Sequence, residues 1–426
     1  MYYLTRAELF IYPNMSDPTT KESTSEIKEL AQEQALYPQE QLAKIKANNK
    51  PLNIGIPNEI SLQENRVLLT PSSVGVITNL GHRVMVETDA GLSAKFTDNE
   101  YSEAGAKIVY SAKEAYDAEI VLKVEPPTIE EINNIPQGAT LISALQMGNQ
   151  TPEFIHALNK KKITGVAFEF IEDKVGGMPV VRAMSEIAGS TVMTIAAHYL
   201  SSSVNGKGVI LGGITGVPPT RVVILGAGTV GEYAARTAIG LGAQVKVFDN
   251  QLYKLRRIKH ALGQQIYTST MDVVTLSNAL EEADVVIGAI RAEKGANRIV
   301  VTEEMVANMR AESVIVDVSI DQGGCIETSQ ITTLKNPVFR KYNVIHYCVP
   351  NIAARVARTA TTAFSNIFTP IIVQVSDAGG VDEMIYSHKW FMKGIYTYRG
   401  SLTNAAIGKK FNLRFRDLNL LMAARI

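Results

Sequence analysis

The fold is decided by the stretch RVVILGAGTVG, which spans residues 221–231. An apolar run rich in β-branched residues leads into three glycines with the spacing G-x-G-x-x-G, namely Gly226, Gly228 and Gly231. In this pattern the first glycine permits a tight turn, the second lets the backbone approach a pyrophosphate, and the third lets a helix pack closely on the strand. The amino terminus of that helix favours an anion. We therefore predict a strand, a phosphate-binding turn and a helix, in that order.

An acidic residue ends the strand that follows this helix. The strand is predicted at residues 244–248, and Asp249 lies directly after it, 18 residues beyond Gly231. A carboxylate at this place can accept hydrogen bonds from ribose hydroxyls and would repel a 2′-phosphate. We therefore predict NAD, rather than NADP, as the cofactor.

The same unit continues with two apolar stretches, residues 283–290 and 313–320, which we predict to be strands. In an open parallel sheet, ligands bind beyond the carboxyl ends of the strands. The ends of these two strands, Ala289-Ile290 and Asp321, should therefore face the nicotinamide half of the cofactor.

Strands and helices also alternate before this unit, which predicts another largely parallel sheet. A helix is expected at residues 71–80, and strands are expected at residues 53–57, 82–87, 120–124, 140–144 and 165–168. These segments need helices on their faces, because strands of a parallel sheet are buried on both sides.

Two long apolar helices, predicted at residues 185–202 and 355–375, flank the nucleotide-binding unit. Their position suggests that this unit is inserted between two parts of the other domain. The expected fold class is therefore α/β with two Rossmann-like domains. The expected boundaries are an amino-terminal extension at residues 1–50, a discontinuous substrate domain at residues 51–180 and 355–426, and an inserted NAD-binding domain at residues 181–354.

The composition suits a protein with a large core. Of 426 residues, 46% are hydrophobic and 20% are charged, which argues against a disordered chain. Lysine and arginine number 42, as do aspartate and glutamate, so charge gives no reason to expect a nucleic acid or an anionic membrane as partner. The two cysteines, Cys325 and Cys348, are too few for a disulfide scaffold. We expect no membrane span and a cytoplasmic location.

Several further stretches resemble the family of alanine dehydrogenase, which includes the NAD-binding subunit of proton-translocating transhydrogenase. The DQGGC segment and the YCV segment point to the alanine dehydrogenase branch. The matching stretches occur in family order and are IGIPNE (54–59), ENRV (64–67), TP (70–71), ETDAG (87–91), MSEIAG (184–189), GGITGVPP (212–219), the glycine motif, DQGGCIE (321–327) and HYCVPN (346–351).

The resemblance implies an activity, a cofactor and an assembly. The family reaction is the reversible oxidative deamination of L-alanine, in which NAD accepts a hydride and pyruvate and ammonium are formed. The resemblance therefore implies an amino acid or a 2-oxo acid as the small-molecule partner, NAD as cofactor, and a homo-oligomer, usually a hexamer. It implies no metal.

The resemblance also assigns roles to individual positions. Arg66 corresponds to the arginine that binds the substrate carboxylate, although without the resemblance an arginine before a strand-to-helix loop would be read as a surface residue. Asp321 corresponds to the catalytic aspartate, and its plain alternative is a turn residue before two glycines. The matching cofactor contacts are Ser185 at the phosphates, which is also a candidate helix N-cap, Lys254 near the adenosine ribose, and Val349 to Ile352, including Asn351, along the nicotinamide.

Two positions depart from the family pattern. The family motif Lys-Val-Lys-Glu-Pro is here Lys123-Val-Glu125-Pro-Pro, and Gln146 stands where the family has a catalytic histidine. Glu125 would repel a substrate carboxylate that a lysine would attract, and Gln146 cannot exchange a proton near neutral pH. Lys123 is either a replacement catalytic group or a structural residue.

These departures leave three functional hypotheses. The favoured one is an NAD-dependent alanine dehydrogenase, or an amino-acid dehydrogenase of that kind. The second is a non-deaminating NAD-binding paralogue, transhydrogenase-like or regulatory, which the residues Glu125 and Gln146 support. The least favoured is a structural oligomer with a vestigial site, because the complete set of glycines with Asp249 argues against it.

Overall fold

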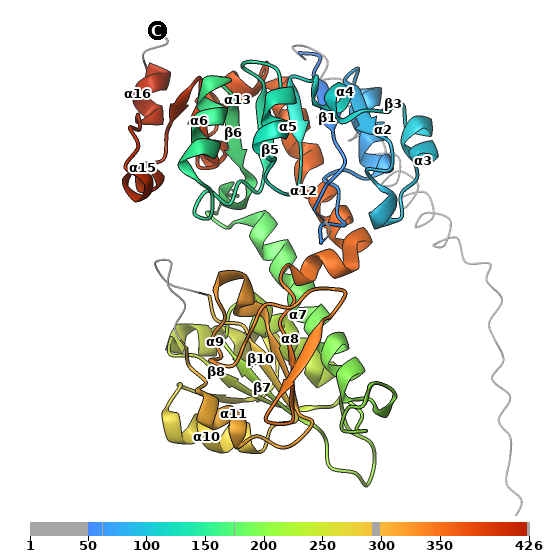
Figure 1. The fold of residues 1–426 in the computed structure, drawn as a ribbon, viewed down its shortest axis with the longest axis vertical. Helices are drawn as coiled ribbons and strands as arrows, with labels where there is room; N and C mark the ends of the chain where they lie inside the picture. Colours follow the sequence, from blue (N-terminus) through green and yellow to red (C-terminus); the bar gives the residue numbers. More distant parts are fainter. Residues whose placement is uncertain (1–49, 62, 174, 292–298, 424–426) are drawn as a thin grey trace, which may run out of the picture.

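The computed structural model describes residues 50–61, 63–173, 175–291 and 299–423 (Figure 1). The extension predicted at residues 1–50 lies outside this part of the chain, apart from Lys50. The described chain forms two lobes, which are joined by the long helices α7 (Pro179–Leu200) and α12 (Ala357–Asp377).

The first lobe is built, within the described ranges, on an eight-stranded sheet. Its strand order is β15-β14-β6-β5-β4-β1-β2-β3, and the strands β1 to β6 run parallel. Both faces are buried: along one strand Ile120 and Leu122 join one apolar cluster while Val121 joins another. The strands are β1 (Asn53–Ile56), β2 (Arg83–Glu87), β3 (Lys107–Val109), β4 (Ile120–Leu122), β5 (Thr140–Ser143), β6 (Thr164–Ala167), β14 (Ile395–Tyr398) and β15 (Ser401–Leu402).

The second lobe contains a seven-stranded sheet in the described chain. Its order is β12-β13-β11-β10-β7-β8-β9, in which β12 is antiparallel to its neighbour and the others run parallel. The strands are β7 (Arg221–Leu225), β8 (Gln244–Phe248), β9 (Tyr267–Ser269), β10 (Val285–Gly288), β11 (Val314–Asp317), β12 (Val338–Lys341) and β13 (Val344–Tyr347). Because the chain returns to the first sheet after this lobe, the second domain is inserted into the first.

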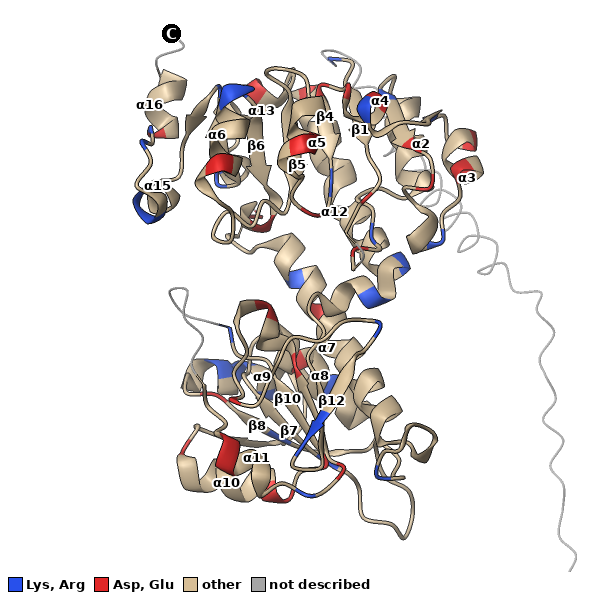
Figure 2. Cartoon of the chain, viewed as in Figure 1, with Lys and Arg blue, Asp and Glu red and all other residues tan. Residues whose placement is uncertain are grey.

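Helices cover the faces of both sheets, as a parallel sheet requires. Acidic and basic residues are interspersed over both lobes (Figure 2). Within the described residues, no helix is long and apolar enough to cross a membrane. The shorter helices are α2 (Pro71–Asn79), α3 (Asp98–Glu103), α4 (Ala112–Tyr116), α5 (Ile129–Asn134), α6 (Pro152–Lys160), α8 (Thr229–Gly240), α9 (Leu252–Leu262), α10 (Val273–Glu281), α11 (Glu303–Ala307), α13 (Val381–Ser387), α14 (Lys389–Met392), α15 (Ala405–Phe411) and α16 (Leu418–Ala423).

The two long helices differ from their predicted bounds. Helix α7 begins at Pro179, with Met178 as N-cap, so Ser185 lies inside the helix and its N-cap interpretation is wrong. Proline fits the first helical turn because its missing N–H has no helical partner there. Helix α12 begins at Ala357 because the residues before it form a 3-10 helix, η5 (Ile352–Val356).

The carboxyl-terminal tail supplies two strands that the sequence analysis did not predict. Strand β14 pairs antiparallel with β6, and Thr397 anchors it: its hydroxyl accepts a hydrogen bond from the N–H of Gly165 (3.0 Å) and donates one to the carbonyl of Ile163 (3.0 Å). The register shifts between Ile395 and Thr397. A four-residue strand with such an irregularity has too little alternation to be detected from its sequence pattern.

Candidate active site

The glycine motif forms the predicted turn between β7 and α8. Gly226 has a φ of +106°, and a Cβ at this residue would lie 2.5 Å from the carbonyl oxygen of Ala289. A Cβ at Gly231 would lie 1.9 Å from the carbonyl oxygen of Gly226. By contrast, a Cβ at Gly228 would meet no described atom within 4 Å. The protein's own packing therefore requires the first and third glycines, whereas the second borders open space at the amino terminus of α8.

Asp249 holds this turn in place. Its carboxylate accepts hydrogen bonds from the backbone N–H of Ala227 (2.8 Å) and of Gln251 (2.8 Å), and the residue is only 7% exposed. Each carboxylate oxygen keeps a further lone pair. The acid at the end of β8 therefore ties the turn to the neighbouring strand, a structural role that the sequence analysis did not anticipate.

Two of the other residues predicted to bind the cofactor lie against the same turn, and the rest lie further from it. Ala289 and Ile290 follow β10 and lie against Gly226. The backbone N–H of Ile290 donates to the hydroxyl of Ser319 (3.0 Å). The remaining positions are Ser185, half-buried inside α7, Lys254, half-buried in the first turns of α9, and Val349, buried after β13.

Arg66 is buried and paired, so its interpretation as a surface residue is wrong. The residue is 7% exposed, and its Nε and Nη2 donate to the two carboxylate oxygens of Glu64 (2.7 and 2.5 Å). Its Nη1 contacts the sulfur of Met184 on α7 (3.4 Å), and its guanidinium lies 5.3 Å from the ring centre of Phe364 on α12. Burial alone would raise the pKa of Glu64, but the hydrogen bonds from Arg66 hold it below its ordinary value.

Asn351 connects this ion pair to Asp321 on the other lobe. Its side-chain amide donates to Glu64 (3.0 Å), and its backbone N–H donates to Oδ1 of Asp321 (2.9 Å). Asn351 has a φ of +56°, a left-handed conformation that asparagine tolerates better than most residues. Desolvation raises the pKa of Asp321, and both Asn351 and the charge of Arg66 oppose that rise. The structure thus brings together Arg66 and Asp321, which the resemblance paired.

The two altered positions lie side by side. The amide of Gln146 donates to Oε2 of Glu125 (3.2 Å). Desolvation and the neighbouring carboxylate of Glu64 raise the pKa of Glu125 to about 7, against the opposing charge of Arg66. Glu125 is therefore neutral more often near pH 7 than an ordinary glutamate, which weakens the expected repulsion of a substrate carboxylate.

Lys123 is held by two other carboxylates. Its ammonium is hydrogen-bonded to Glu59 and lies 3.8 Å from Glu131, and the residue is 2% exposed. Glu59 also accepts a hydrogen bond from the backbone N–H of Val124 (2.5 Å). These contacts join β1, β4 and α5. They favour the structural alternative for Lys123.

Family models match both lobes. The model for the "Alanine dehydrogenase/PNT, N-terminal domain" matches residues 55–188, and the model for the "Alanine dehydrogenase/PNT, C-terminal domain" matches residues 192–405. The chain belongs to the alanine dehydrogenase/PNT family. The predicted resemblance is therefore confirmed.

Individual relatives in this family are similar over almost their whole length. The alanine dehydrogenase of Methanococcus maripaludis is 39% identical over 85% of this chain and 97% of its own length. That of Bacillus subtilis is 38% identical, with 85% and 95% covered, and that of Mycolicibacterium smegmatis is 37% identical, with 87% and 100% covered.

Solved structures of the family confirm the predicted fold class. An L-alanine dehydrogenase matches with a TM-score of 0.80 and 37% identity, covering 84% of this chain and 99% of its own. A transhydrogenase from Sinorhizobium meliloti matches with a TM-score of 0.71 and 25% identity, covering 83% and 99%. These matches favour the alanine dehydrogenase assignment over the transhydrogenase-like alternative.

Sequence reasoning missed several residues that shape this member of the alanine dehydrogenase/PNT family. Glu64, two residues before Arg66, neutralises it, and the Glu-x-Arg spacing is the signal that could have revealed the pair. Glu169 accepts a hydrogen bond from the backbone N–H of Gln146 (2.8 Å), while its Oε2 is buried with no hydrogen-bond partner among the described atoms. Burial raises the pKa of Glu169 to about 7. Nothing in the local sequence signals this contact.

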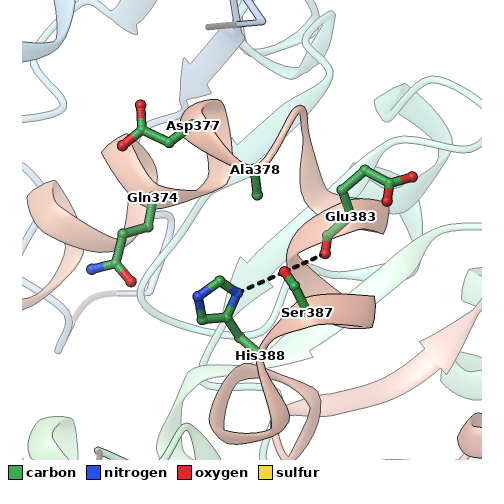
Figure 3. Close-up of a pocket in the computed structure, with 6 residues that line it drawn as sticks. All are labelled: Gln374, Asp377, Ala378, Glu383, Ser387 and His388. Atoms are coloured by element: carbon green, nitrogen blue, oxygen red, sulfur yellow. Dashed lines mark hydrogen bonds between the residues drawn. The ribbon is translucent and has the colours of Figure 1, made fainter. Parts of the chain in front are cut away.

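A surface hollow of about 380 Å³ lies elsewhere, between the end of α12 and α13 (Figure 3). Within it, the hydroxyl of Ser387 is hydrogen-bonded to the ring of His388 (2.7 Å) and to the carbonyl of Glu383 (2.6 Å). The predicted site residues do not line this hollow. In the described residues, no group of three or more histidine, cysteine, aspartate or glutamate side chains could hold a metal ion. The lining residues are Gln374, Asp377, Ala378, Glu383, Ser387 and His388.

Proposed function

We propose that this chain catalyses the reversible, NAD-dependent oxidative deamination of L-alanine to pyruvate and ammonium. The observation that carries the proposal is the series of contacts that links Arg66, through Glu64 and Asn351, to Asp321. A guanidinium matches the shape of a substrate carboxylate, and a carboxyl group can hold or release a proton. The relatives named alanine dehydrogenase support the same activity.

NAD fits the nucleotide-binding lobe. The open space beside Gly228 at the amino terminus of α8 suits a pyrophosphate, and Asp249 keeps lone pairs for ribose hydroxyls. When bound, NAD supplies the acceptor of the hydride that leaves the substrate Cα. The remaining residues assigned to the cofactor in this proposal are Gly226, Gly231, Ser185, Lys254, Ala289, Ile290, Val349 and Asn351.

Arg66 and Asp321 act on the substrate from opposite lobes in this proposal. Nε and Nη2 of Arg66 donate hydrogen bonds to Glu64, and we propose that Nη1 donates to the substrate carboxylate. The N–H of Asn351 fixes Oδ1 of Asp321, and we assign Oδ2 to a hydrogen bond with the substrate nitrogen. Lys123 supports the site by holding Glu59.

The proposal extends to the boundaries, the assembly and the location. The substrate domain comprises residues 51–180 and 355–426, and the NAD-binding domain comprises residues 181–354. A homohexamer follows from the family resemblance, and gel filtration with light scattering tests it. Two free, buried cysteines support a reducing, cytoplasmic location.

One alternative has a specific observation in its favour. The positions where the family has lysine and histidine hold Glu125 and Gln146, and these two side chains are bonded to each other. General acid–base help is typically worth about 10²–10⁴-fold, so a site without it would turn over slowly. The alternative is therefore a non-deaminating NAD-binding paralogue.

One assay separates the two functions. The purified protein is mixed with NAD and L-alanine at alkaline pH, NADH absorbance is followed, and a panel of other amino acids is measured beside it. We expect NADH from L-alanine. If no amino acid yields NADH while calorimetry shows NAD binding, the non-deaminating alternative is correct. The double change Glu125→Lys with Gln146→His should then restore deamination, and a dead double variant would show that the site is misplaced.

A further inference from the structure

We propose that Glu125 is the group that moves protons during imine hydrolysis in this site, with Gln146 as its positioning residue. The inference rests on the proposed function and adds to it a catalytic residue specific to this chain. It replaces the interpretation of Glu125 as an obstacle to the substrate.

The backbone and side chain of Glu125 are both fixed. Its carbonyl accepts a hydrogen bond from the hydroxyl of Ser143 (2.9 Å), and its Oε2 accepts one from the amide of Gln146 (3.2 Å). Gln146 is held in turn, because its backbone N–H donates to Glu169 and its carbonyl accepts from the N–H of Asn149 (2.7 Å). The Glu125 carboxyl is therefore presented in one orientation.

The neighbouring charges decide which acid carries the proton. The charged groups that face Glu125 are Glu64, Arg66 and Glu59. Arg66 donates two hydrogen bonds to Glu64, which lower the pKa of Glu64 and keep its carboxylate ionised. Two adjacent carboxyls cannot both ionise easily, so the proton is left to Glu125. Its pKa of about 7 lies where an acid–base catalyst exchanges protons readily.

The proton steps balance as follows. Hydride loss from the amine form of the substrate leaves a protonated imine, and as a water oxygen attacks its carbon, the C=N π pair moves to nitrogen and ionised Glu125 takes the water proton. The protonated Glu125 then gives this proton to the amine nitrogen. The C–N bond breaks with its electron pair on nitrogen, and the hydroxyl proton returns to Glu125 as the carbonyl forms. Ammonia and the 2-oxo acid leave, and Glu125 releases its proton to ammonia or solvent.

The same arrangement couples anion binding to a proton. A 2-oxo acid carboxylate bound at Arg66 brings a negative charge close to Glu125, which raises the pKa of that carboxyl further. Above pH 7, Glu125 therefore holds a proton more often after binding than before it. Binding must therefore take up a proton, and the affinity for the 2-oxo acid must rise as the pH falls.

Calorimetry measures this uptake without turnover. Pyruvate is titrated at pH 8 into the protein saturated with NAD, which gives no reaction because no hydride donor is present, in phosphate and in Tris. The difference in heat between the two buffers gives the protons taken up. We expect a net uptake of protons, at most one per pyruvate, in the wild type and in Glu130→Gln, whose exposed carboxyl on α5 is the matched control, and none in Glu125→Gln.

Gln146→Leu tests the positioning residue. Loss of an amide donor to the ionised carboxylate should move the pH midpoint of the uptake upward by up to about one unit, while the uptake itself remains. Should Glu125→Gln fail to bind NAD, Glu125→Asp replaces it, and the uptake must then persist with a displaced midpoint.

Equal uptake in wild type and Glu125→Gln, or none in wild type, would overturn the proposal. An unmoved midpoint in Glu125→Asp or Gln146→Leu would also count against it. The NADH assay tests the proposed function separately. If the wild type takes up the proton but oxidises no amino acid, the proposed function is refuted, whereas Glu125 remains the proton-binding group.

Discussion

The glycine turn and the charged substrate pocket are built in opposite ways. In the turn, backbone packing within one strand-turn-helix unit fixes each residue: a Cβ at Gly226 or Gly231 would collide with carbonyl oxygens. In the pocket, polar side chains bond to one another: Glu64 neutralises Arg66 two positions away, and Asn351 reaches Glu64 across 287 positions. The turn therefore depends on shape and the pocket on charge balance. Variants that disturb only one of these properties test this contrast.

The largest effect is expected from breaking the buried ion pair. Arg66→Met leaves the carboxylate of Glu64, whose side chain is fully buried, without its partner. Removing one member of a buried pair costs about 3–5 kcal/mol, so the free energy of unfolding should fall by that amount. Urea denaturation measures it.

The matched control for Arg66→Met is Lys50→Met, which breaks the pair with Glu119, whose two side chains are about half exposed. A surface pair is worth about 0–1 kcal/mol. The double change Arg66→Met with Glu64→Leu should recover part of the stability, because it removes both charges. Equal losses for Arg66→Met and Lys50→Met would refute the charge-balance account of the pocket.

The turn should respond to added volume instead. Gly231→Ala places a Cβ 1.9 Å from the carbonyl oxygen of Gly226, and such overpacking costs about 1–3 kcal/mol. The matched variant Gly240→Ala lies on the same helix, where a Cβ meets no described atom within 4 Å, and should stabilise the protein by up to about 1 kcal/mol. Thermal denaturation of both variants checks the signs. If Gly240→Ala also destabilised the protein, the loss of stability in Gly231→Ala could not be attributed to the contact with the carbonyl oxygen of Gly226.

The contrast also explains how much the sequence could predict. The turn, its strand and its helix were predicted because each requirement is local: a φ of +106° at Gly226 and the close approach at Gly231 both select glycine. The strands β1, β2, β4 to β8, β10 and β11 were predicted for the same reason, since buried strands are continuous apolar runs. The strands β3, β9 and β12 to β15 were not predicted. Where an element is short, as in β14, the local signal disappears and prediction fails.

The pocket could be predicted only in part, because its properties arise between segments. The resemblance located Arg66, Asp321 and the altered positions Glu125 and Gln146. It did not indicate that Arg66 would be neutralised by Glu64, and therefore that Glu125 would retain a proton near pH 7. The Glu-x-Arg spacing could have revealed the pair of Glu64 and Arg66. The charge of Glu125 depends on its burial and on these neighbours in space, which the sequence around Glu125 does not encode.

A smaller effect is expected from Glu169, which lies behind the pocket. Burial raises its pKa from the ordinary 4.5 to about 7, so the folded protein keeps a proton that the unfolded chain releases between these values. The stability that this proton contributes is complete below pH 4.5 and is lost as the pH rises through 7. In Glu169→Gln the fall in stability with pH should be shallower, by at most about 1.4 kcal/mol per pH unit. Denaturation curves from pH 5 to about pH 8 measure the slopes, and unchanged slopes would assign the pH dependence to other groups.

The smallest effect is expected at Asn351, which links Glu64 on the first lobe to Asp321 on the second. Asn351→Gly keeps the left-handed backbone and the N–H that binds Asp321, but it loses the amide that binds Glu64. Because Glu64 retains its bonds from Arg66, the loss should be about 1 kcal/mol. Asn351→Ala loses the same amide and adds strain of about 1 kcal/mol, since alanine disfavours a positive φ. The two variants should therefore lose equal catalytic efficiency while the alanine variant unfolds at lower denaturant. If efficiency instead follows stability, Asn351 serves the backbone alone, and the link from Arg66 to Asp321 has no part in catalysis.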